Sequence, residues 1–377
     1  MQDRMRILLL GEYSNVHNTL AGGLRELGHE VTVASNGDFW RDYSRDINLA
    51  RGMGITGTVS FLYRLLRALP KMRGYDIVQL INPVFLELKA ERLYRIFDYL
   101  KRHNGKVVLL AAGDDYYYPE LHTRRKVMRY SDFYIGDEEH CCDFVRTQTR
   151  EWLYGEKGRL TRYVAKRCDA IVACAYEYWL PYNLSEDTSP DGERLNKKLY
   201  SIPFAYSIPD KPVSRVAGKV RVFIGISRER SEMKGTDIML QAARDLQRLY
   251  PDRMELLVAN GVSFDEYSRM MDSSDVLLDQ IYSYGPGMNA LLAMSKGIVA
   301  VSGAEPEHYE QLGENEVRPI VNVYPSYEDV YRNLEKLILN PELVNRLKLQ
   351  SREYVARNHE YIRVSRQYVE LYSKLLG

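Results

Sequence analysis

Two series of short apolar runs constrain the fold of this chain more than any other feature of its sequence. The runs of the first series are residues 6–10, 30–34, 76–81, 106–111 and 169–173. They are apolar at nearly every position, which is typical of strands buried on both faces of a parallel sheet. Amphipathic helical segments, such as 17–27 and 86–102, alternate with them. The first half therefore predicts a doubly wound α/β domain.

The second series repeats this pattern after a polar, proline-containing stretch. Its runs are residues 220–225, 254–258, 276–278, 298–301 and 318–321. The stretch 205–218 contains Pro209 and Pro212 and reads as a linker, and the tail 327–376 is helical with an interruption near Pro341. We expect two Rossmann-like domains, the first over 1–205 and the second from 206. Ligands of such sheets bind at the carboxyl ends of the strands, which predicts a cleft between the domains as the site.

Composition narrows the class of protein. The 377 residues are 45% hydrophobic and 27% charged, as in soluble globular chains. Lys and Arg (52) balance Asp and Glu (51), so nucleic acid is not an expected partner. Four irregularly spaced cysteines form no disulfide or zinc pattern, no apolar run approaches the roughly 18 residues of a membrane span, and no secretory signal is visible. We expect a cytoplasmic protein.

The first candidate site follows the first strand. Gly11 and Glu12 open a turn before a helix that contains Gly22 and Gly23. Such a turn accepts an anion through free backbone N–H groups. An ordinary strand–helix turn of this fold has the same composition, so the alternative is a turn that binds no anion. The turn is no G-x-G-x-x-G fingerprint, and a dinucleotide cofactor is therefore not expected.

The second candidate site follows the strand 106–111. Asp114, Asp115 and Tyr116 place two carboxylates and an aromatic run at a strand's carboxyl end, which suits hydroxyl recognition or proton transfer. The alternative is a helix cap plus a solvated acid. No further carboxylate or histidine lies beside the pair at ligand spacing, so we expect no metal there.

The third and fourth candidate sites belong to the second half. Arg228, Arg230 and Lys234 follow a strand and precede a helix, where converging cations neutralise a diphosphate. The alternative is a solvated charged loop.

In the fourth candidate site, a strand leads through a glycine-containing loop into a helix. This is an anion-binding geometry, but an ordinary strand–helix connection also explains it. Its candidate residues are Gly285, Gly287, Met288 and Asn289.

Taken in order, these places resemble the GT-B glycosyltransferases, in particular the family-4 retaining type, over nearly the whole chain. Residues 20–31 are similar to the first helix and second strand of that family, and 202–204 to its entry into the linker. Arg228 or Arg230 with Lys234-Gly235 resembles the arginine–lysine pair that holds the donor diphosphate. The segment 286–297 resembles the glycine loop and helix that face the same phosphates. The segment 359–372 resembles the closing helix, which implies that 361–377 packs back toward the N-terminal domain while 206–360 binds the donor.

The chain departs from that family at three positions. The two glutamates of the family's helix motif fall on Tyr284 and Leu292. Asn289, or Glu305 and Glu307 after the next strand, are candidates to replace the carboxylate that holds the donor ribose. The family's His-Asp pair appears as Gly113-Asp114, or as Asp114-Asp115 if shifted by one.

The resemblance implies a nucleotide-sugar-dependent glycosyltransferase of the hexosyltransferase type, metal-independent, retaining, without cofactor, and involved in cell-surface polysaccharide synthesis. Arg228, Lys234 and Asp114 are the expected catalytic residues, Asp114 orienting the acceptor or the transferred sugar. Arg230 and Glu307 complete the donor side; Gly11, Glu12, Asp115 and Tyr116 form the acceptor side. The alternatives are a silent GT-B protein that binds nucleotide or glycan without turnover and, last, a sugar-nucleotide epimerase.

The expected partners are a nucleotide sugar and a glycan or lipid-linked acceptor. Basic runs in the first half are compatible with peripheral contact to acidic lipid at the inner membrane face. A solvated helix face explains the same runs. They comprise His122–Arg129 together with Arg64, Arg67, Lys71 and Arg73.

Overall fold

The computed structural model describes residues 4–140 and 142–377, and its contacts divide the chain into two compact units. Unit 1 comprises Met1–Leu121, Gln148–Ala205 and Tyr361–Gly377, and unit 2 comprises His122–Thr147 and Tyr206–Glu360. Each unit is described by itself. Of the four cysteines, Cys141 lies outside the described residues, and the other three are free thiols.

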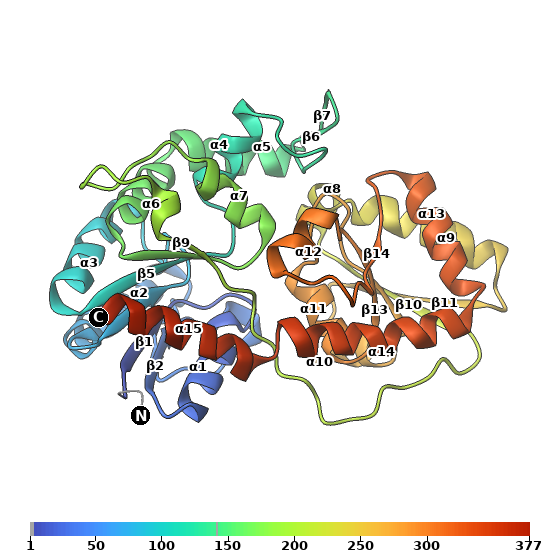
Figure 1. The fold of residues 1–377 in the computed structure, drawn as a ribbon, viewed down its shortest axis with the longest axis horizontal. Helices are drawn as coiled ribbons and strands as arrows, with labels where there is room; N and C mark the ends of the chain where they lie inside the picture. Colours follow the sequence, from blue (N-terminus) through green and yellow to red (C-terminus); the bar gives the residue numbers. More distant parts are fainter. Residues whose placement is uncertain (1–3, 141) are drawn as a thin grey trace. The chain divides into compact units, whose positions relative to one another are not determined.

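A seven-stranded parallel sheet forms the centre of unit 1 (Figure 1). Its strands lie in the order β3-β2-β1-β4-β5-β8-β9, so the order reverses direction between β1 and β4. They are β1 (Arg6–Leu10), β2 (Glu30–Ser35), β3 (Ile47–Asn48), β4 (Ile77–Leu80), β5 (Lys106–Ala111), β8 (Ala170–Ala173) and β9 (Leu199–Ser201). The five apolar runs of the first series are all strands of this sheet.

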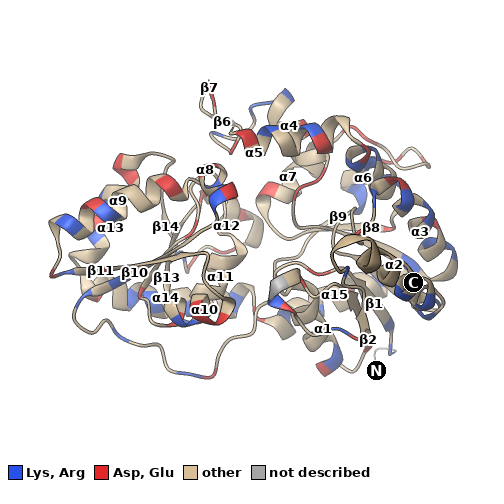
Figure 2. Cartoon of the chain, turned by 180° about the vertical axis from the view of Figure 1, so that it is seen from behind, with Lys and Arg blue, Asp and Glu red and all other residues tan. Residues whose placement is uncertain are grey.

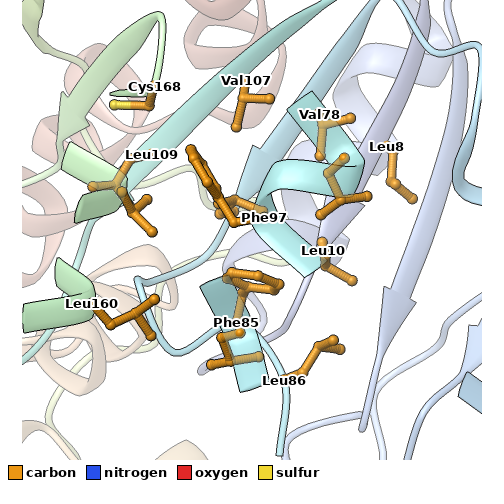
Figure 3. Packing of buried hydrophobic residues seen from close by; sticks show 14 of the residues in the cluster. Leu8, Leu10, Val78, Phe85, Leu86, Phe97, Val107, Leu109, Leu160 and Cys168 are labelled. Carbon is orange, nitrogen blue, oxygen red and sulfur yellow. The ribbon is translucent and has the colours of Figure 1, made fainter. Parts of the chain in front are cut away.

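Both faces of this sheet are buried, as the continuous apolar runs predict. Leu8 and Leu10 of β1 pack in one cluster with Phe97, while the alternating Ile7 and Leu9 are equally buried outside that cluster (Figure 3). Successive strand residues point to opposite faces, so helices cover both. The helices whose bounds fall in or at the edge of unit 1 are α1 (Val16–Glu26), α2 (Gly54–Ala68), α3 (Ala90–His103), α4 (Tyr117–Arg124), α5 (Asp143–Thr149), α6 (Glu156–Arg167), α7 (Tyr176–Leu184) and α15 (Tyr361–Leu376).

The last helix of the chain, α15, belongs to unit 1 and packs against α1. The two helices approach closely at Gly23, where a Cβ atom would stand 2.1 Å from Ser365 Oγ and 2.9 Å from the Tyr361 carbonyl oxygen. Tyr372 donates a buried hydrogen bond of 2.7 Å to Gln79 Oε1 in β4. Unit 1 is therefore completed by a segment from the far end of the chain.

Unit 2 is built around a five-stranded parallel sheet in the order β11-β10-β12-β13-β14. Its strands are β10 (Val220–Ile226), β11 (Met254–Asn260), β12 (Val276–Leu278), β13 (Val299–Ser302) and β14 (Val321–Asn322). Val222 and Ile224 pack with Met239 of α9 on one face, and Phe223 meets the ring of Tyr267 in α10 on the other. Its helices are α8 (Ser231–Lys234), α9 (Thr236–Leu249), α10 (Phe264–Asp272), α11 (Met288–Ser295), α12 (Pro306–Leu312), α13 (Tyr327–Ile338) and α14 (Pro341–Asn358).

The segment 122–147 differs from the sequence-based domain assignment. The sequence places it within the first domain, residues 1–205, whereas its contacts in the structure are with unit 2. It contains a small hairpin, β6 (Tyr134–Ile135) with β7 (Glu138–Glu139), and Ile135 packs against the core of unit 2. This affiliation matters because the segment brings charged and aromatic side chains to the sheet of unit 2.

Candidate functional site

The strand order of unit 2 reverses between β10 and β12, and two predicted sites follow these strands. Ligands of doubly wound sheets bind at such a reversal, beyond the carboxyl ends of the strands. The loop after β10 carries Arg228, Arg230 and Lys234, and the loop after β12 leads into α11. The third and fourth predicted sites therefore occupy one edge of one sheet.

A buried carboxylate, Asp279, joins these two loops. Asp279 Oδ1 lies 3.9 Å from Lys234 Nζ, and Asp279 Oδ2 accepts hydrogen bonds from the Gly287 backbone N–H (2.9 Å) and from Ser302 Oγ (3.3 Å). The Asp279 side chain is only 1% exposed. Asp279 thus contacts the Lys234 ammonium group through one oxygen and the start of α11 through the other. Asp279 begins the loop of the fourth predicted site but was not one of its predicted residues, because only the structure shows that it faces Lys234.

The two arginines of this edge are more solvated than Lys234. Arg228 and Arg230 lie in a single 3-10 turn and are both exposed. The Arg230 guanidinium stands 5.8 Å from the ring centre of Phe144, a residue of the segment 122–147. Lys234 is 27% exposed at its side chain. Of the three predicted cations, Lys234 is the one that the fold holds in place.

The residues at the start of α11 are tied to the body of unit 2. Gly285 is buried, and Gly287 is the residue before the first turn of the helix. The Met288 carbonyl accepts a hydrogen bond from the Tyr206 hydroxyl (2.6 Å). Asn289 Oδ1 accepts one from the Tyr267 hydroxyl (2.9 Å). Asn289, a candidate replacement for the family's ribose-binding carboxylate, is therefore already engaged through its oxygen.

A second charged cluster stands at the carboxyl ends of β12 and β13. The Arg129 guanidinium, from the segment 122–147, donates to Glu305 (2.7 Å) and to both oxygens of Glu307 (2.6 and 3.0 Å). It also lies 4.8 Å from the ring centre of Tyr284, whose hydroxyl accepts the Arg129 backbone N–H (2.5 Å). The Arg129 hydrogen bonds lower the pKa of Glu307. Both replacement candidates after β13 thus bind a protein cation.

Tyr284 and Glu305 are the buried members of this cluster. Glu305 Oε1 accepts hydrogen bonds from the Tyr130 hydroxyl (2.5 Å) and from Asn322 Nδ2 (3.1 Å). Burial raises the pKa of Tyr284 to about 12, so its hydroxyl stays protonated. Tyr284 stands at a position where the resembled family has a glutamate, and its ring packs beneath a guanidinium. Sequence reasoning missed Arg129 because its partners are more than 170 residues away.

In unit 1 the strand order reverses between β1 and β4, and the first predicted site lies there. Gly11 has a φ of +89°, and a Cβ atom at this position would stand 2.2 Å from Ile81 Cγ2. Glu12 is 1% exposed and accepts the backbone N–H groups of His17 (3.3 Å) and Asn18 (2.8 Å). Burial raises the pKa of Glu12 to about 8. Its carboxyl group is therefore protonated in neutral solution and serves the start of α1.

His17 extends this buried site toward the last helix. Its Nδ1 lies 2.8 Å from the Gly11 carbonyl oxygen and its Nε2 lies 3.2 Å from Gln79 Nε2. Because a carbonyl and an amide N–H flank the ring, Nδ1 donates and Nε2 accepts, which is the neutral tautomer. Burial lowers the pKa of His17 to about 4, in agreement with a neutral ring. His17 was not among the predicted site residues, since its two partners, the Gly11 carbonyl and Gln79, are brought to it by the fold.

The structure separates the two aspartates of the second predicted site. Asp115 is 3% exposed; its Oδ1 accepts the backbone N–H of Tyr117 (2.7 Å), and its Oδ2 accepts the hydroxyl of Tyr182 (2.7 Å). It caps α4, and burial raises its pKa to about 6. Asp114 is exposed. The ring of Tyr116 meets Tyr117 edge-on and lies under Arg162 (5.2 Å in both contacts). In this pair Asp115 is the buried helix cap, and Asp114 is the exposed acid.

No group of three or more His, Cys, Asp or Glu residues suited to a metal ion occurs among the described residues. The predicted donor residues lie together in unit 2, at one sheet edge. The predicted acceptor-side residues and Asp114 lie in unit 1, at the edge formed by β1, β4 and β5.

Comparison with known proteins gives no match to a family model and none to a curated protein sequence. Solved structures do match. HepE of Anabaena, determined in complex with UDP and glucose, is similar over 98% of this chain and 100% of its own (TM-score 0.59, 13% identity). Sucrose-phosphate synthase of Thermosynechococcus elongatus is similar over 99% of both chains (0.59, 12%). The likeness covers both units at full length.

This chain has the GT-B fold. A third GT-B neighbour, WaaG, a glycosyltransferase involved in lipopolysaccharide biosynthesis, is similar over 97% of this chain and 98% of its own (TM-score 0.56, 12% identity). The GT-B assignment confirms the fold expected from the two series of apolar runs. At identities of 12–13%, the similarity to these structures establishes the fold alone. A function has to be inferred from the residues of the site.

Proposed function

We propose that this GT-B protein transfers a sugar from a nucleotide-sugar donor to a hydroxyl group of a glycan or lipid-linked acceptor. The observation that carries the proposal is Lys234, held by buried Asp279 beside the start of α11 at the strand-order reversal of unit 2. A cation and helix amides at such a reversal form a site for the phosphates of a nucleotide. That HepE is solved with UDP-glucose supports a nucleotide sugar as the ligand.

On the donor side, the charge that develops on the leaving diphosphate requires stabilisation. Lys234 supplies a fixed ammonium group, and the first amides of α11 supply aligned dipoles. Arg228 and Arg230, on their exposed turn, are the further cations within this loop. We propose that these groups stabilise the leaving group without a divalent ion, and that configuration at the anomeric carbon is retained.

On the acceptor side, we assign Asp114 the role of orienting the hydroxyl group or the transferred sugar. Asp114 is an exposed residue, whereas Asp115 is buried and its two oxygens accept hydrogen bonds from the Tyr117 backbone and the Tyr182 hydroxyl. In retaining transfer without a protein nucleophile, as in the resembled family, the leaving phosphate takes the proton of the acceptor. The residues of unit 1 would then position the acceptor rather than ionise it.

The test is donor hydrolysis by the purified protein, measured with UDP-, GDP- and ADP-sugars. We expect slow release of nucleoside diphosphate from one donor class and a loss of at least about 100-fold in the Lys234→Ala variant, since single stabilising groups contribute this much. Lys296→Ala is the matched control, because Lys296 also pairs with an aspartate, Asp272, but at the other end of α11. Tight binding of nucleotide without turnover for any donor would instead identify a silent GT-B protein.

A further inference from the structure

Helix α2 of unit 1 presents a second apolar face to solvent. Its exposed apolar residues recur at helical spacing, so they share one side of the helix. They are Ile55 (83% exposed), Val59 (60%), Tyr63 (58%) and Leu66 (68%), with Met53 (96%) immediately before the helix. Large apolar side chains that are exposed together on one helix face indicate an interaction site.

The fold of unit 1 does not require this face. Phe61, Leu65 and Ala68 are the residues by which α2 packs into the unit 1 core, and they lie on another side of the helix. A surface helix normally needs one apolar stripe, directed at the core. The outer stripe of Ile55, Val59 and Leu66 is therefore available to a partner outside the unit.

The charges of α2 and of the chain on either side of it are all of one sign. Between Asp46 and Asp76 the sequence contains no acidic residue. The same stretch contains five cations; Figure 2 colours the Lys and Arg residues of the chain blue and labels α2. The five cations are Arg51, Arg64, Arg67, Lys71 and Arg73. Arg67 Nη1 donates to the Tyr63 hydroxyl (2.8 Å), so a cation and an amphipathic ring stand together at the border of the apolar face.

An anionic lipid surface fits this pattern better than a second copy of the chain does. In a two-fold interface the same patch meets itself, which would bring five cations against five cations. In a membrane interface, apolar side chains enter the boundary of the acyl chains while Lys, Arg and Tyr remain among the head groups. Each cation near such a surface adds to the attraction.

We propose that α2 is an interfacial anchor that binds the surface of membranes containing anionic lipid. The helix lies in the plane of the head groups, with Ile55, Val59 and Leu66 directed into the membrane. Within the described residues, no helix has the length and apolar character needed to span a bilayer, and α2 itself has 15 residues. The proposal concerns unit 1 and does not depend on the donor chemistry of unit 2.

The first test is flotation of the full chain with vesicles of phosphatidylcholine, with and without phosphatidylglycerol. We expect binding to the anionic vesicles, and a loss of about tenfold or more in the triple variant Ile55→Ser/Val59→Ser/Leu66→Ser. The matched control is Leu249→Ser/Leu349→Ser, which removes two leucines that are 58% and 61% exposed elsewhere. Absence of binding by the unmodified protein, or equal binding by the triple variant, would overturn the proposal.

The second test reverses charge. Arg67→Glu/Lys71→Glu is expected to weaken binding to anionic vesicles about tenfold or more and to remove most of its salt dependence. Arg215→Glu, at a side chain 71% exposed in unit 2, is the control and is expected to bind as the unmodified protein does. Equal losses in both variants would show a nonspecific charge effect and contradict an anchor at α2.

The third test needs no substitution and so does not depend on a variant folding. Hydrogen–deuterium exchange of the unmodified protein is compared with and without anionic vesicles. We expect protection across residues 53–66. Protection of the basic segment 122–129 in its place, or a concentration-dependent dimer in sedimentation that the triple variant abolishes, would assign the surface to another partner. Nucleoside diphosphate binding, measured on the same samples, tests the proposed function separately.

Discussion

The carboxyl edges of the two sheets accommodate buried acids in opposite ways. In unit 1, Glu12 and Asp115 are surrounded by backbone N–H groups and a tyrosine hydroxyl, and burial raises the pKa of both. In unit 2, Asp279 faces Lys234, and Glu305 and Glu307 face one guanidinium.

The different partners of these acids indicate what the carboxyl edge of each sheet is suited to. A neutral hydrogen-bonded carboxyl group changes its protonation state within the range of ordinary buffers, whereas a carboxylate beside a cation keeps its charge. The edge of unit 1 therefore responds to pH. The edge of unit 2 pairs its acids with cations, which suits the binding of a charged ligand, and these ion pairs respond to salt.

The largest expected effect is that of Glu12→Gln on the pH dependence of stability. The folded protein keeps a proton up to about pH 8 that the unfolded chain releases near pH 4.5. The free energy of unfolding therefore falls as pH rises through this interval, by about 1.4 kcal/mol per unit at most, and levels off above it. In the variant this slope disappears, so its stability relative to the parent grows with pH.

Thermal unfolding across that interval, with hydrogen exchange of α1 to assign the effect to unit 1, is the measurement. Glu91→Gln, an exposed acid in the first turn of α3, is the control and is expected to follow the parent. Parallel pH profiles for Glu12→Gln and the parent would remove the distinction between the two edges.

The next effect is that of Arg129→Met in unit 2. The change leaves Glu305, only 9% exposed, without its cation. Because the Arg129 side chain is itself 52% exposed, we expect a loss of about 1–2 kcal/mol in the free energy of unfolding rather than the larger cost of a fully buried pair. Urea unfolding at low and high salt measures it, and the loss should shrink with salt. Arg129→Lys should retain part of the stability, and a loss independent of salt would contradict the charge pairing.

Tyr372→Phe tests an uncharged hydrogen bond of unit 1, for comparison with the ion pairs of unit 2. It removes the hydrogen bond to Gln79 and leaves a buried carbonyl unsatisfied, which costs about 1 kcal/mol. Since no charge is involved, the loss should be the same at every salt concentration and should appear in the exchange of unit 1 amides alone. Tyr361→Phe, which removes an exposed bond to Glu26, is the control with a smaller effect.

The smallest effect is expected for Arg215→Ala. Arg215 pairs with Glu342, and their side chains are 71% and 78% exposed, so we expect a change below about 0.5 kcal/mol. Urea unfolding under the conditions used for Arg129→Met measures it. A change as large as that of Arg129→Met would show that burial of Glu305 is not what distinguishes the edge of unit 2.

The elements that the sequence predicted well are those whose local pattern decides their structure. The runs at 6–10 and 220–225 are apolar at nearly every position and became central strands. The edge strands β3 and β9 have two and three residues, too short for a pattern. For α2 the sequence offered only a solvated helix face around Arg64 and Arg67 and gave no range, because its two apolar faces and its glycines give no single amphipathic period.

The residues of the candidate site also differ in how far their local sequence predicted them. Lys234 and Gly287 were predicted from the loops that follow two strands, and Asp279 brings them together. Arg129 could not be predicted, because nothing local indicates that the segment 122–147 belongs to unit 2. The sequence could not predict whether Asp114 or Asp115 is the buried acid either, because this depends on a tertiary contact of Asp115 with the hydroxyl of Tyr182.

The position of α15 has a consequence for biosynthesis. During synthesis β1 and α1 emerge before every strand of unit 2, but the helix that covers them, α15, follows unit 2 in the chain. Unit 1 cannot acquire its complete core before α15 has been translated, whereas unit 2 has all its strands before α15 appears. A stop codon placed directly before α15 would therefore harm unit 1, which begins to emerge before unit 2.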